Sequence, residues 1–274
     1  MDWLDLHFEA NRSDYEAALR SAGIEQGWHV LDAACGAGNY LPWISELVGS
    51  KGSITALDLA PENIAIVKQR CVLEWHLDAA IETSEGSVLD LPYPDQTFDA
   101  IWFANTSQYL PDEELTITLA EFRRVLKPDG LLAVKDMDIG MWAIVPGPAD
   151  AFWKFFAYLI HSEGWNQIKG LSSRAWNMQN WLGHAGFTDI RQQTLPIEWR
   201  APLTEAQRGC LTQMLGDFSS QILQLVASGE LRLPDDVRQF WAIAGEPDHP
   251  DHPVNSDDCY SRDGQFVATG RAPA

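Results

Sequence analysis

Positive charge is scarce in this sequence of 274 residues. It holds 19 lysines and arginines against 39 aspartates and glutamates, and its formal net charge at pH 7 is −20. Such an excess of negative charge repels nucleic acid and anionic membrane surfaces. The composition therefore argues against an enzyme that acts on DNA or RNA and against a nucleic-acid partner.

Long apolar runs and paired cysteines are also missing. No run of about 18 apolar residues could cross a bilayer, and no charged start is followed by an apolar stretch. We therefore expect a soluble, cytoplasmic protein without a membrane span. The four cysteines show neither a C-x-x-C pair nor zinc spacing, so we expect free thiols and no metal site. They are Cys35, Cys71, Cys210 and Cys259.

One stretch, residues 28–40, organises the rest of the chain. A short buried strand is predicted from the apolar residues Val30, Leu31, Ala33 and Ala34. Gly36 and Gly38 follow, and then a helical run over residues 40–48. Strand, glycine turn and helix form the geometry in which backbone N–H groups face a polar ligand. Glycine suits such a turn because a Cβ would block either the turn or the approach of the ligand.

A second predicted strand, residues 54–59, ends in Asp58 about twenty residues after the glycine turn. A Rossmann-like fold places a carboxylate there to accept hydrogen bonds from ribose hydroxyls. A dinucleotide fingerprint also needs a third glycine, and Leu41 occupies that position. The pattern therefore opposes a nicotinamide-dependent oxidoreductase, which we keep as the weaker alternative.

The order Asp32-x-x-Cys35-Gly36-x-Gly38 resembles motif I of the class I S-adenosylmethionine-dependent methyltransferases. The family pattern has a further glycine where this chain has Ala34. In this family the ligand carries an amino-acid end in place of a pyrophosphate.

Two further stretches carry the same resemblance. Residues 89–99 are similar to an "LPFPDxSFD" segment, and residues 121–130 to an "RVLKPGG" turn, of the methyltransferases of ubiquinone and menaquinone biosynthesis and of natural-product methylation. Within the second stretch, Arg123 and Arg124 are expected on a solvated helix face. The three motifs lie in order within residues 28–137.

Strands and short helices alternate from residue 28 to residue 137, which predicts a parallel sheet covered on both faces. The fold class that the resemblance implies is α/β, a Rossmann-like, doubly wound, mostly parallel sheet of seven strands. Its last strand is antiparallel, and insertions form a helical cap. We expect residues 139–173 to be helical with breaks, and residues 187–199 and 260–271 to form the closing antiparallel pair.

The predicted organisation has six segments. Residues 1–27 form an N-terminal helical segment over the cofactor, and residues 28–138 form the cofactor-binding core. Residues 139–174 and 201–258 are helical cap inserts. Residues 175–200 supply a core helix and strand, and residues 259–274 supply the last core strand and the tail.

The resemblance implies S-adenosylmethionine as cofactor and assigns its methionyl end to four residues. Gly36 and Gly38 let this end approach the backbone, and Asp32 holds its ammonium group. Asn105 leaves the fourth strand at the carboxyl edge of the sheet and meets the same moiety.

Four more residues are assigned to the adenosine. Asp58 accepts hydrogen bonds from the ribose hydroxyls, and Leu59 lies on one face of the adenine. Ser87 and Val88 address the adenine edge; the family often has aspartate where this chain has Ser87.

Tryptophans mark the expected substrate wall, because large rings offer contact area to a flat or greasy molecule. The candidates are Trp142, Trp153, Trp165, Trp176 and Trp181, although packing of the insert would equally explain them. Candidate bases or positioning residues are His7, Tyr15, Tyr109 and His161.

We therefore expect an enzyme that moves a methyl group from S-adenosylmethionine to N, O or C of a hydrophobic small molecule. The acceptor is expected to be aromatic or isoprenoid-like, and transfer is an in-line displacement. A catalytically silent binding subunit with the same fold is the main alternative. The sequence leaves open the acceptor atom, the identity of the substrate and the oligomeric state.

Overall fold

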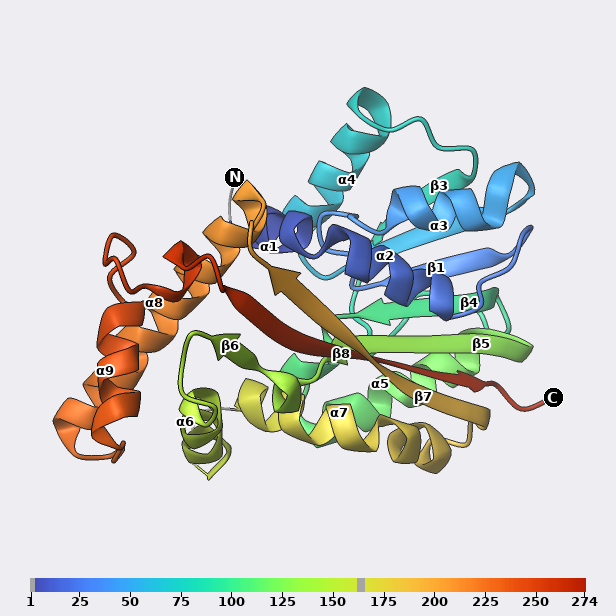
Figure 1. Ribbon diagram of the computed structural model, residues 1–274. Helices are drawn as coiled ribbons and strands as arrows, with labels where there is room; N and C mark the ends of the chain where they lie inside the picture. Colours follow the sequence, from blue (N-terminus) through green and yellow to red (C-terminus); the bar gives the residue numbers. More distant parts are fainter. Residues whose placement is uncertain (1–2, 162–165) are drawn as a thin grey trace. The chain divides into compact units, whose positions relative to one another are not determined.

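The computed structural model describes residues 3–161 and 166–274, with side chains for residues 6–158 and 174–274 (Figure 1). The chain divides into two compact units. We call the first the helical unit; it comprises Met1–Tyr15, Asp138–Ser172 and Pro196–Gly264. We call the second the sheet unit; it comprises Glu16–Met137, Ser173–Leu195 and Gln265–Ala274.

The sheet confirms the expected α/β class. Its path runs in the order β3 (Ala80–Glu85), β2 (Ser53–Asp58), β1 (His29–Ala33), β4 (Phe98–Ala104), β5 (Leu126–Met137) and β8 (Tyr260–Arg271). The first five strands are parallel to one another, whereas β8 runs antiparallel to β5. β7 (Thr188–Arg200) pairs with β8, so the last strand lies between β5 and β7.

Register brings the candidate residues to one edge of the sheet. Asp32 of β1 lies opposite Ala56 of β2 and Trp102 of β4. The three strands therefore end side by side, and the loops that follow them start at the same edge. A parallel doubly wound sheet binds its ligands at this carboxyl edge.

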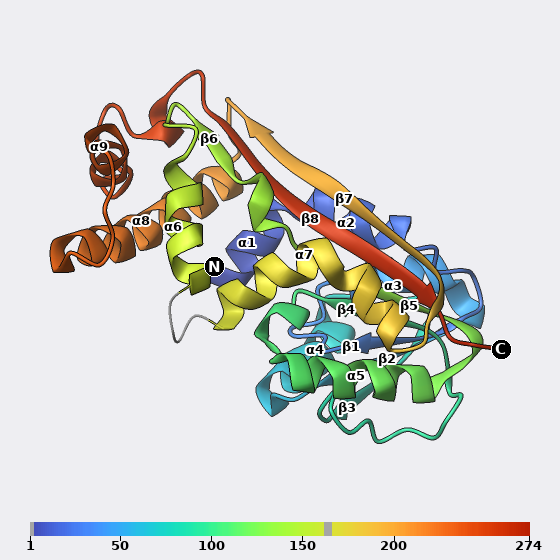
Figure 2. The ribbon, with the colours of Figure 1, turned by 90° about the horizontal axis from the view of Figure 1, so that it is seen from below.

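Helices cover both faces of the sheet, which explains the continuous apolar strands. α3 (Leu41–Val48) and α4 (Pro61–Leu73) lie on one face in Figure 1. α5 (Asp112–Val125) and α7 (Asn166–His184) lie side by side on the other face, as Figure 2 shows. On that second face Phe103 packs edge-on against Phe122 of α5 at 5.1 Å between ring centroids. Met178 of α7 is fully buried in the same cluster.

The helical unit contains α1 (Trp3–Ala10), α6 (Ala151–His161), α8 (Glu205–Ser228) and α9 (Asp235–Ala244). α2 (Arg12–Ser21) begins in this unit and continues into the sheet unit. Local sequence sets the bounds of α8. Thr204 and Gln207 form a capping box at its start, and Gly229 ends it in the left-handed conformation.

One strand was not predicted. Ala143–Val145 forms β6, which pairs antiparallel with the start of β8, where residues 139–173 were expected to be helical. Three residues are too few to show strand periodicity, and pairing with a segment more than a hundred residues away creates this strand. Among the residues that the structure describes, the sheet therefore has eight strands instead of the expected seven.

Aromatic rings form the core of the helical unit. Trp142 contacts Phe152, Phe156 and Phe218 with centroids 5.5, 5.3 and 5.3 Å away, and Phe152 packs edge-on against Trp241 at 5.2 Å. No helix among residues 3–161 and 166–274 is long and apolar enough to cross a bilayer.

Candidate functional site

The loop after β1 is the centre of the candidate site. It holds three residues with positive φ, Ala34 at 58°, Gly36 at 54° and Gly38 at 77°. A left-handed conformation is strained for alanine by about 1–2 kcal/mol. Ala34 therefore adopts a left-handed conformation that glycine adopts without strain, which is why glycine suits this position in the family pattern.

The two glycines differ in what surrounds them. A Cβ on Gly36 would meet nothing within 4 Å, so the space beside its backbone is open. A Cβ on Gly38 would lie 2.8 Å from Leu41 and 2.9 Å from Val67, whose side chains come from α3 and α4. Gly36 thus suits close approach of a ligand, whereas Gly38 is required for packing of the loop against the two helices.

Arg70 of α4 holds this loop from outside. Its guanidinium donates to the Ala37 carbonyl at 3.0 Å and to Asn39 Oδ1 at 2.7 Å. Sequence reasoning missed this residue, because an arginine in a polar helix carries no signal of its partner.

Asp58 joins the ends of β1 and β2. One oxygen accepts from the Gly36 N–H at 2.7 Å, and the other accepts from the Ala60 N–H at 2.9 Å and from Asn63 Nδ2 at 3.0 Å. The carboxylate is 8% exposed. Its expected contact with ribose hydroxyls remains a prediction, and the structure adds that Asp58 also shapes the loop.

Asp32 is a buried acid with an incomplete set of partners. It is 2% exposed, and Oδ2 has no hydrogen-bond partner within the described part of the chain. Burial, and then the charge of Asp58, raise the pKa of Asp32 to about 8. A buried carboxylate of this kind needs a cationic or hydrogen-donating partner. An ammonium group meets that need, so the residue fits the methionyl end of S-adenosylmethionine.

Asn105 lies at the end of β4 in the left-handed conformation, with φ at 54°. Its Oδ1 accepts from Lys135 Nζ at 2.7 Å. Lys135 is buried and was not predicted as a site residue. Lys135 is one of several consecutive buried residues of β5, and nothing in the sequence indicates that its side chain contacts Asn105.

A second buried acid fixes the segment after Asn105. Asp136 of β5 accepts from Ser107 Oγ at 2.8 Å, from the Gln108 N–H at 3.0 Å and from Gln108 Nε2 at 2.9 Å. Burial raises the pKa of Asp136, while these hydrogen bonds and the charge of Lys135 lower it. The loop that presents Asn105 is therefore held to β5 by a satisfied polar network.

The three residues assigned to the adenine lie in different environments. Leu59 is 70% exposed. The Ser87 hydroxyl oxygen accepts from the Leu89 N–H at 3.1 Å and so shapes its own turn. The Val88 side chain packs in the core, and the adenine contacts of all three residues remain predictions.

The second and third sequence motifs pack on each other. Arg124 donates to the Tyr93 and Leu91 carbonyls at 2.7 and 3.0 Å and pairs with Glu121, which itself accepts from the Leu91 N–H. The expectation of a solvated helix face is therefore wrong for Arg124. Arg123 also has a partner, the Ala185 carbonyl at 2.8 Å, although its surroundings are exposed.

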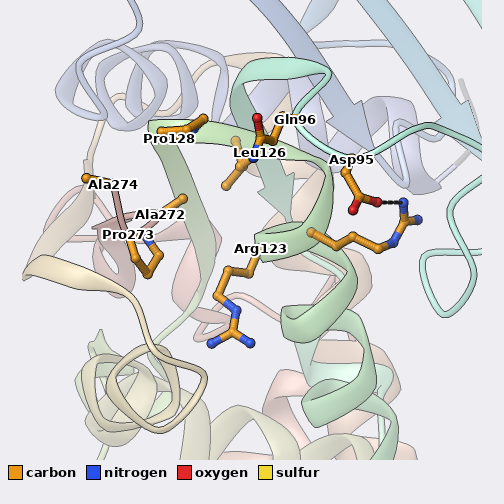
Figure 3. A pocket seen from close by; sticks show the side chains of 9 residues that line it. Asp95, Gln96, Arg123, Leu126, Pro128, Ala272, Pro273 and Ala274 are labelled. Carbon is orange, nitrogen blue, oxygen red and sulfur yellow. Dashed lines mark hydrogen bonds and ion pairs between the residues drawn. The ribbon is translucent and has the colours of Figure 1, made fainter.

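A hollow of about 280 Å³ lies beside the contact between these two motifs, at the start of β5 and the end of the chain (Figure 3). Arg123 points into it, and Asp95 pairs with Arg124 at its rim. It lies at the amino end of β5, whereas Asp32, Asp58 and Asn105 lie at the carboxyl edge of the sheet. This hollow is therefore separate from the candidate cofactor site.

Two of the four candidate bases meet in the structure. The Tyr15 hydroxyl lies 3.4 Å from His7 Nδ1 within the helical unit, and Tyr15 is 2% exposed. Tyr109 is 58% exposed and lies in the sheet unit. His161 ends α6, but its side chain lies outside the described residues.

The candidate substrate tryptophans do not form one group. Trp142 packs in the aromatic cluster of the helical unit, and Trp153 is 46% exposed on α6. Trp176 and Trp181 belong to α7 in the sheet unit; Trp181 packs against the core with Arg174 4.8 Å from its ring. Trp165 lies outside the described residues.

Comparison with known proteins finds methyltransferases. Residues 30–130 match the model of a methyltransferase domain. A demethylmenaquinone methyltransferase of Listeria welshimeri is 28% identical over 62% of this chain and 69% of its own length. One of Listeria monocytogenes is 31% identical over 56% of this chain and 62% of its own length. The chain thus spans about two thirds of these relatives.

Solved structures show the same fold. A putative methyltransferase of Bacillus halodurans superposes with a TM-score of 0.59, at 16% identity, over 96% of this chain and all of that one. The [4+2]-cyclase SpnF gives a TM-score of 0.53, at 21% identity, over 97% of this chain and 81% of its own. Because a cyclase shares this fold, the fold alone does not establish methyl transfer.

Proposed function

We propose that this chain is a class I S-adenosylmethionine-dependent methyltransferase and that its acceptor is a hydrophobic, quinol-like small molecule. Two relatives are named for demethylmenaquinone, an aromatic ring with an isoprenoid tail. A net charge of −20 also opposes nucleic acid as the acceptor. The four cysteines are free thiols, which supports action in the cytoplasm.

The observation that carries the cofactor is the buried carboxyl of Asp32 beside the open backbone of Gly36. Asp32 would hold the ammonium, Asn105 the methionyl moiety and Asp58 the ribose, while Leu59 covers the adenine. S-adenosylmethionine, when bound, supplies an electrophilic methyl group on a sulfonium whose thioether leaves without help. The chain therefore needs to orient the acceptor and exclude water, and such positioning supplies roughly 7–11 kcal/mol of a barrier.

Proton removal from the acceptor is assigned to the His7–Tyr15 pair. A quinol oxygen, or a ring carbon activated by it, becomes a better nucleophile when its hydroxyl proton is taken. Tyr15 would orient the ring, since its hydroxyl lies 3.4 Å from His7 Nδ1. His7→Gln should lower kcat more than it raises KM. Tyr15→Phe should have a smaller effect in the same direction.

Product detection tests this proposal. The protein is incubated with S-adenosylmethionine and either a prenylated naphthoquinol or the same ring without its tail, and products are followed by mass spectrometry. We expect a gain of one CH₂ unit and faster turnover of the prenylated acceptor. Faster turnover of the bare ring would remove the isoprenoid part of the proposal.

The silent-subunit alternative has its own signature in the same experiment. Calorimetric binding of S-adenosylhomocysteine with no methylated product from any quinol, catechol or amine acceptor would identify a binding protein. Asp58→Ala is the matched negative control, because it should lose both binding and product.

A further inference from the structure

The stretch between α9 and β8, within the helical unit, has a role that the proposed function does not use. Residues 246–258 hold five acids and three prolines, and we call them the acidic segment. Two histidines lie in it, His249 and His252. His252 has no exposed surface. An imidazole buried in this way must be neutral or paired, so its contacts decide what the residue does.

Two hydrogen bonds fix the protonation state of His252. Its Nε2 lies 3.2 Å from the carbonyl oxygen of Ala244, the last residue of α9. A carbonyl can only accept, so Nε2 carries a proton. Its Nδ1 accepts from the Val254 N–H at 3.3 Å, so this nitrogen presents its lone pair. Only the neutral ring with its proton on Nε2 satisfies both partners.

Protonation of His252 is unfavourable in the folded chain. A proton on Nδ1 would point at the Val254 N–H, which cannot accept it. Burial lowers the pKa of His252 below its ordinary value of 6.5, and so do the charges of Arg208 on α8 and His249 on the acidic segment. From α9 the ring meets the Ala244 carbonyl, whose hydrogen bond raises the pKa but does not offset these effects.

Asn255 joins the same segment to α8. Its Oδ1 accepts from Arg208 at 3.0 Å, and its Nδ2 donates to the Pro247 and His249 carbonyls at 2.9 and 3.1 Å. The Asn255 N–H donates to the His252 carbonyl at 2.9 Å. The turn that Asn255 binds to α8 is therefore the turn that His252 binds to the end of α9.

We propose that His252 is a pH-dependent latch, which holds the acidic segment on the end of α9 when it is neutral and releases the segment when it is protonated. In the step Nδ1 takes one proton from water, and the hydrogen bond from the Val254 N–H breaks. Release exposes Val254 and Cys259, which are 3% and 2% exposed in the structure. The inference does not depend on the proposed cofactor or acceptor.

Acid should favour the released form. A released His252 binds its proton near pH 6.5, whereas the held ring binds it only at lower pH. Between these two values, each fall of one pH unit should raise the population of the released form by up to about tenfold. Above about pH 7.5 that population should no longer depend on His252.

Amide hydrogen exchange of the whole protein measures this population. Protection factors, which remove the intrinsic pH dependence of exchange, are followed by mass spectrometry from about pH 5 to pH 8 for peptides that contain Val254 and Asn255. We expect protection of the acidic segment to fall by up to about tenfold between about pH 7.5 and pH 5.5. Protection that is flat over this range would overturn the inference.

His252→Gln removes the titrating group and keeps an N–H donor for the Ala244 carbonyl. This variant should show lower protection at neutral pH, because it loses the acceptor for Val254, and no further loss in acid. His249→Gln is the matched control, since it changes a histidine of the same segment whose Nδ1 accepts from the Asp251 N–H at 3.1 Å. The control should keep the parental pH dependence. An equal slope in parent and His252→Gln would contradict the latch.

Nitrogen NMR of the histidine rings in the parent protein keeps the test decisive if His252→Gln does not fold. The spectra distinguish the two neutral tautomers and the charged ring. We expect His252 to carry its proton on Nε2 at neutral pH and to become charged over the pH range in which the segment loses protection. A proton on Nδ1 at neutral pH, or a charged ring in a segment that stays protected, would refute the inference.

Discussion

Affinity for the cofactor product should depend steeply on pH through Asp32. The pKa of this carboxyl is raised to about 8 by burial and by Asp58, so it is mostly protonated at neutral pH in the free protein. Binding an ammonium group requires the ionised form. Each ligand molecule bound near neutral pH should therefore release close to one proton, and Asp32→Asn should abolish the release.

The size of the effect follows from the ionised fraction. With a pKa near 8, that fraction rises about ninefold between pH 6 and pH 7 and about fivefold between pH 7 and pH 8. Affinity for S-adenosylhomocysteine should therefore gain roughly fiftyfold over these two pH units, about 2 kcal/mol, and should level off above pH 8. The Asp32→Asn variant should bind weakly at every pH and show no such slope.

The raised pKa of Asp32 also makes the stability of the fold depend on pH. The pKa of Asp32 is raised from 3.8 to about 8 on folding, so between these values the native state holds a proton that the unfolded chain has lost. The free energy of unfolding should therefore fall as pH rises through this window. Asp32→Asn carries no such proton and should be the more stable of the two at pH 8 in the absence of ligand.

Calorimetry in two buffers of different ionisation enthalpy, repeated from about pH 6 to pH 9, measures affinity and proton release together. Urea unfolding of both proteins at the same pH values checks the stability slope. An affinity that is flat between pH 6 and pH 8, with the same proton count in parent and variant, would refute the role of Asp32.

Three further predictions concern the loops at the site and the contact between the second and third motifs. Asp58→Ala should lower affinity for S-adenosylmethionine at least tenfold. Because the carboxylate also accepts three hydrogen bonds, this variant should lower the free energy of unfolding in urea by about 1–3 kcal/mol, and Asp58→Asn should lower it less. Gly38→Val should abolish binding by displacing the loop against Val67, and a folded variant with parental affinity would mean that this loop is not the cofactor site. Arg124→Met should lower the melting temperature by several degrees, and Arg123→Met should lower it by much less. Equal effects would contradict the role of the Arg124 hydrogen bonds in joining the second and third motifs.

Local sequence was enough to predict the strand–glycine–helix unit and the alternating core. Residues such as Val30 and Leu31 are apolar on both sides of the strand, and this pattern belongs to a sheet covered on both faces. The candidate cofactor residues Asp32, Gly36 and Asp58 could be proposed from sequence for the same reason, since each occupies a fixed position relative to a strand end.

The partners of buried charges could not be predicted. Lys135 and Asn105 are thirty residues apart, and only the parallel pairing of β4 and β5 brings them to 2.7 Å. Arg124 was expected to be solvated because a helix sequence does not reveal which loop will lie against it. β6 was invisible because its three residues become a strand only through pairing with the distant β8.

Sequence alone was therefore enough to predict the fold class and the cofactor, because these predictions depend on motifs within one strand–loop–helix unit. Only the tertiary structure decided which acid lacks a partner, which lysine orients Asn105 and which tryptophans are core. Each of these depends on contacts between segments that pack together only in the folded chain, where burial changes the chemistry of a side chain.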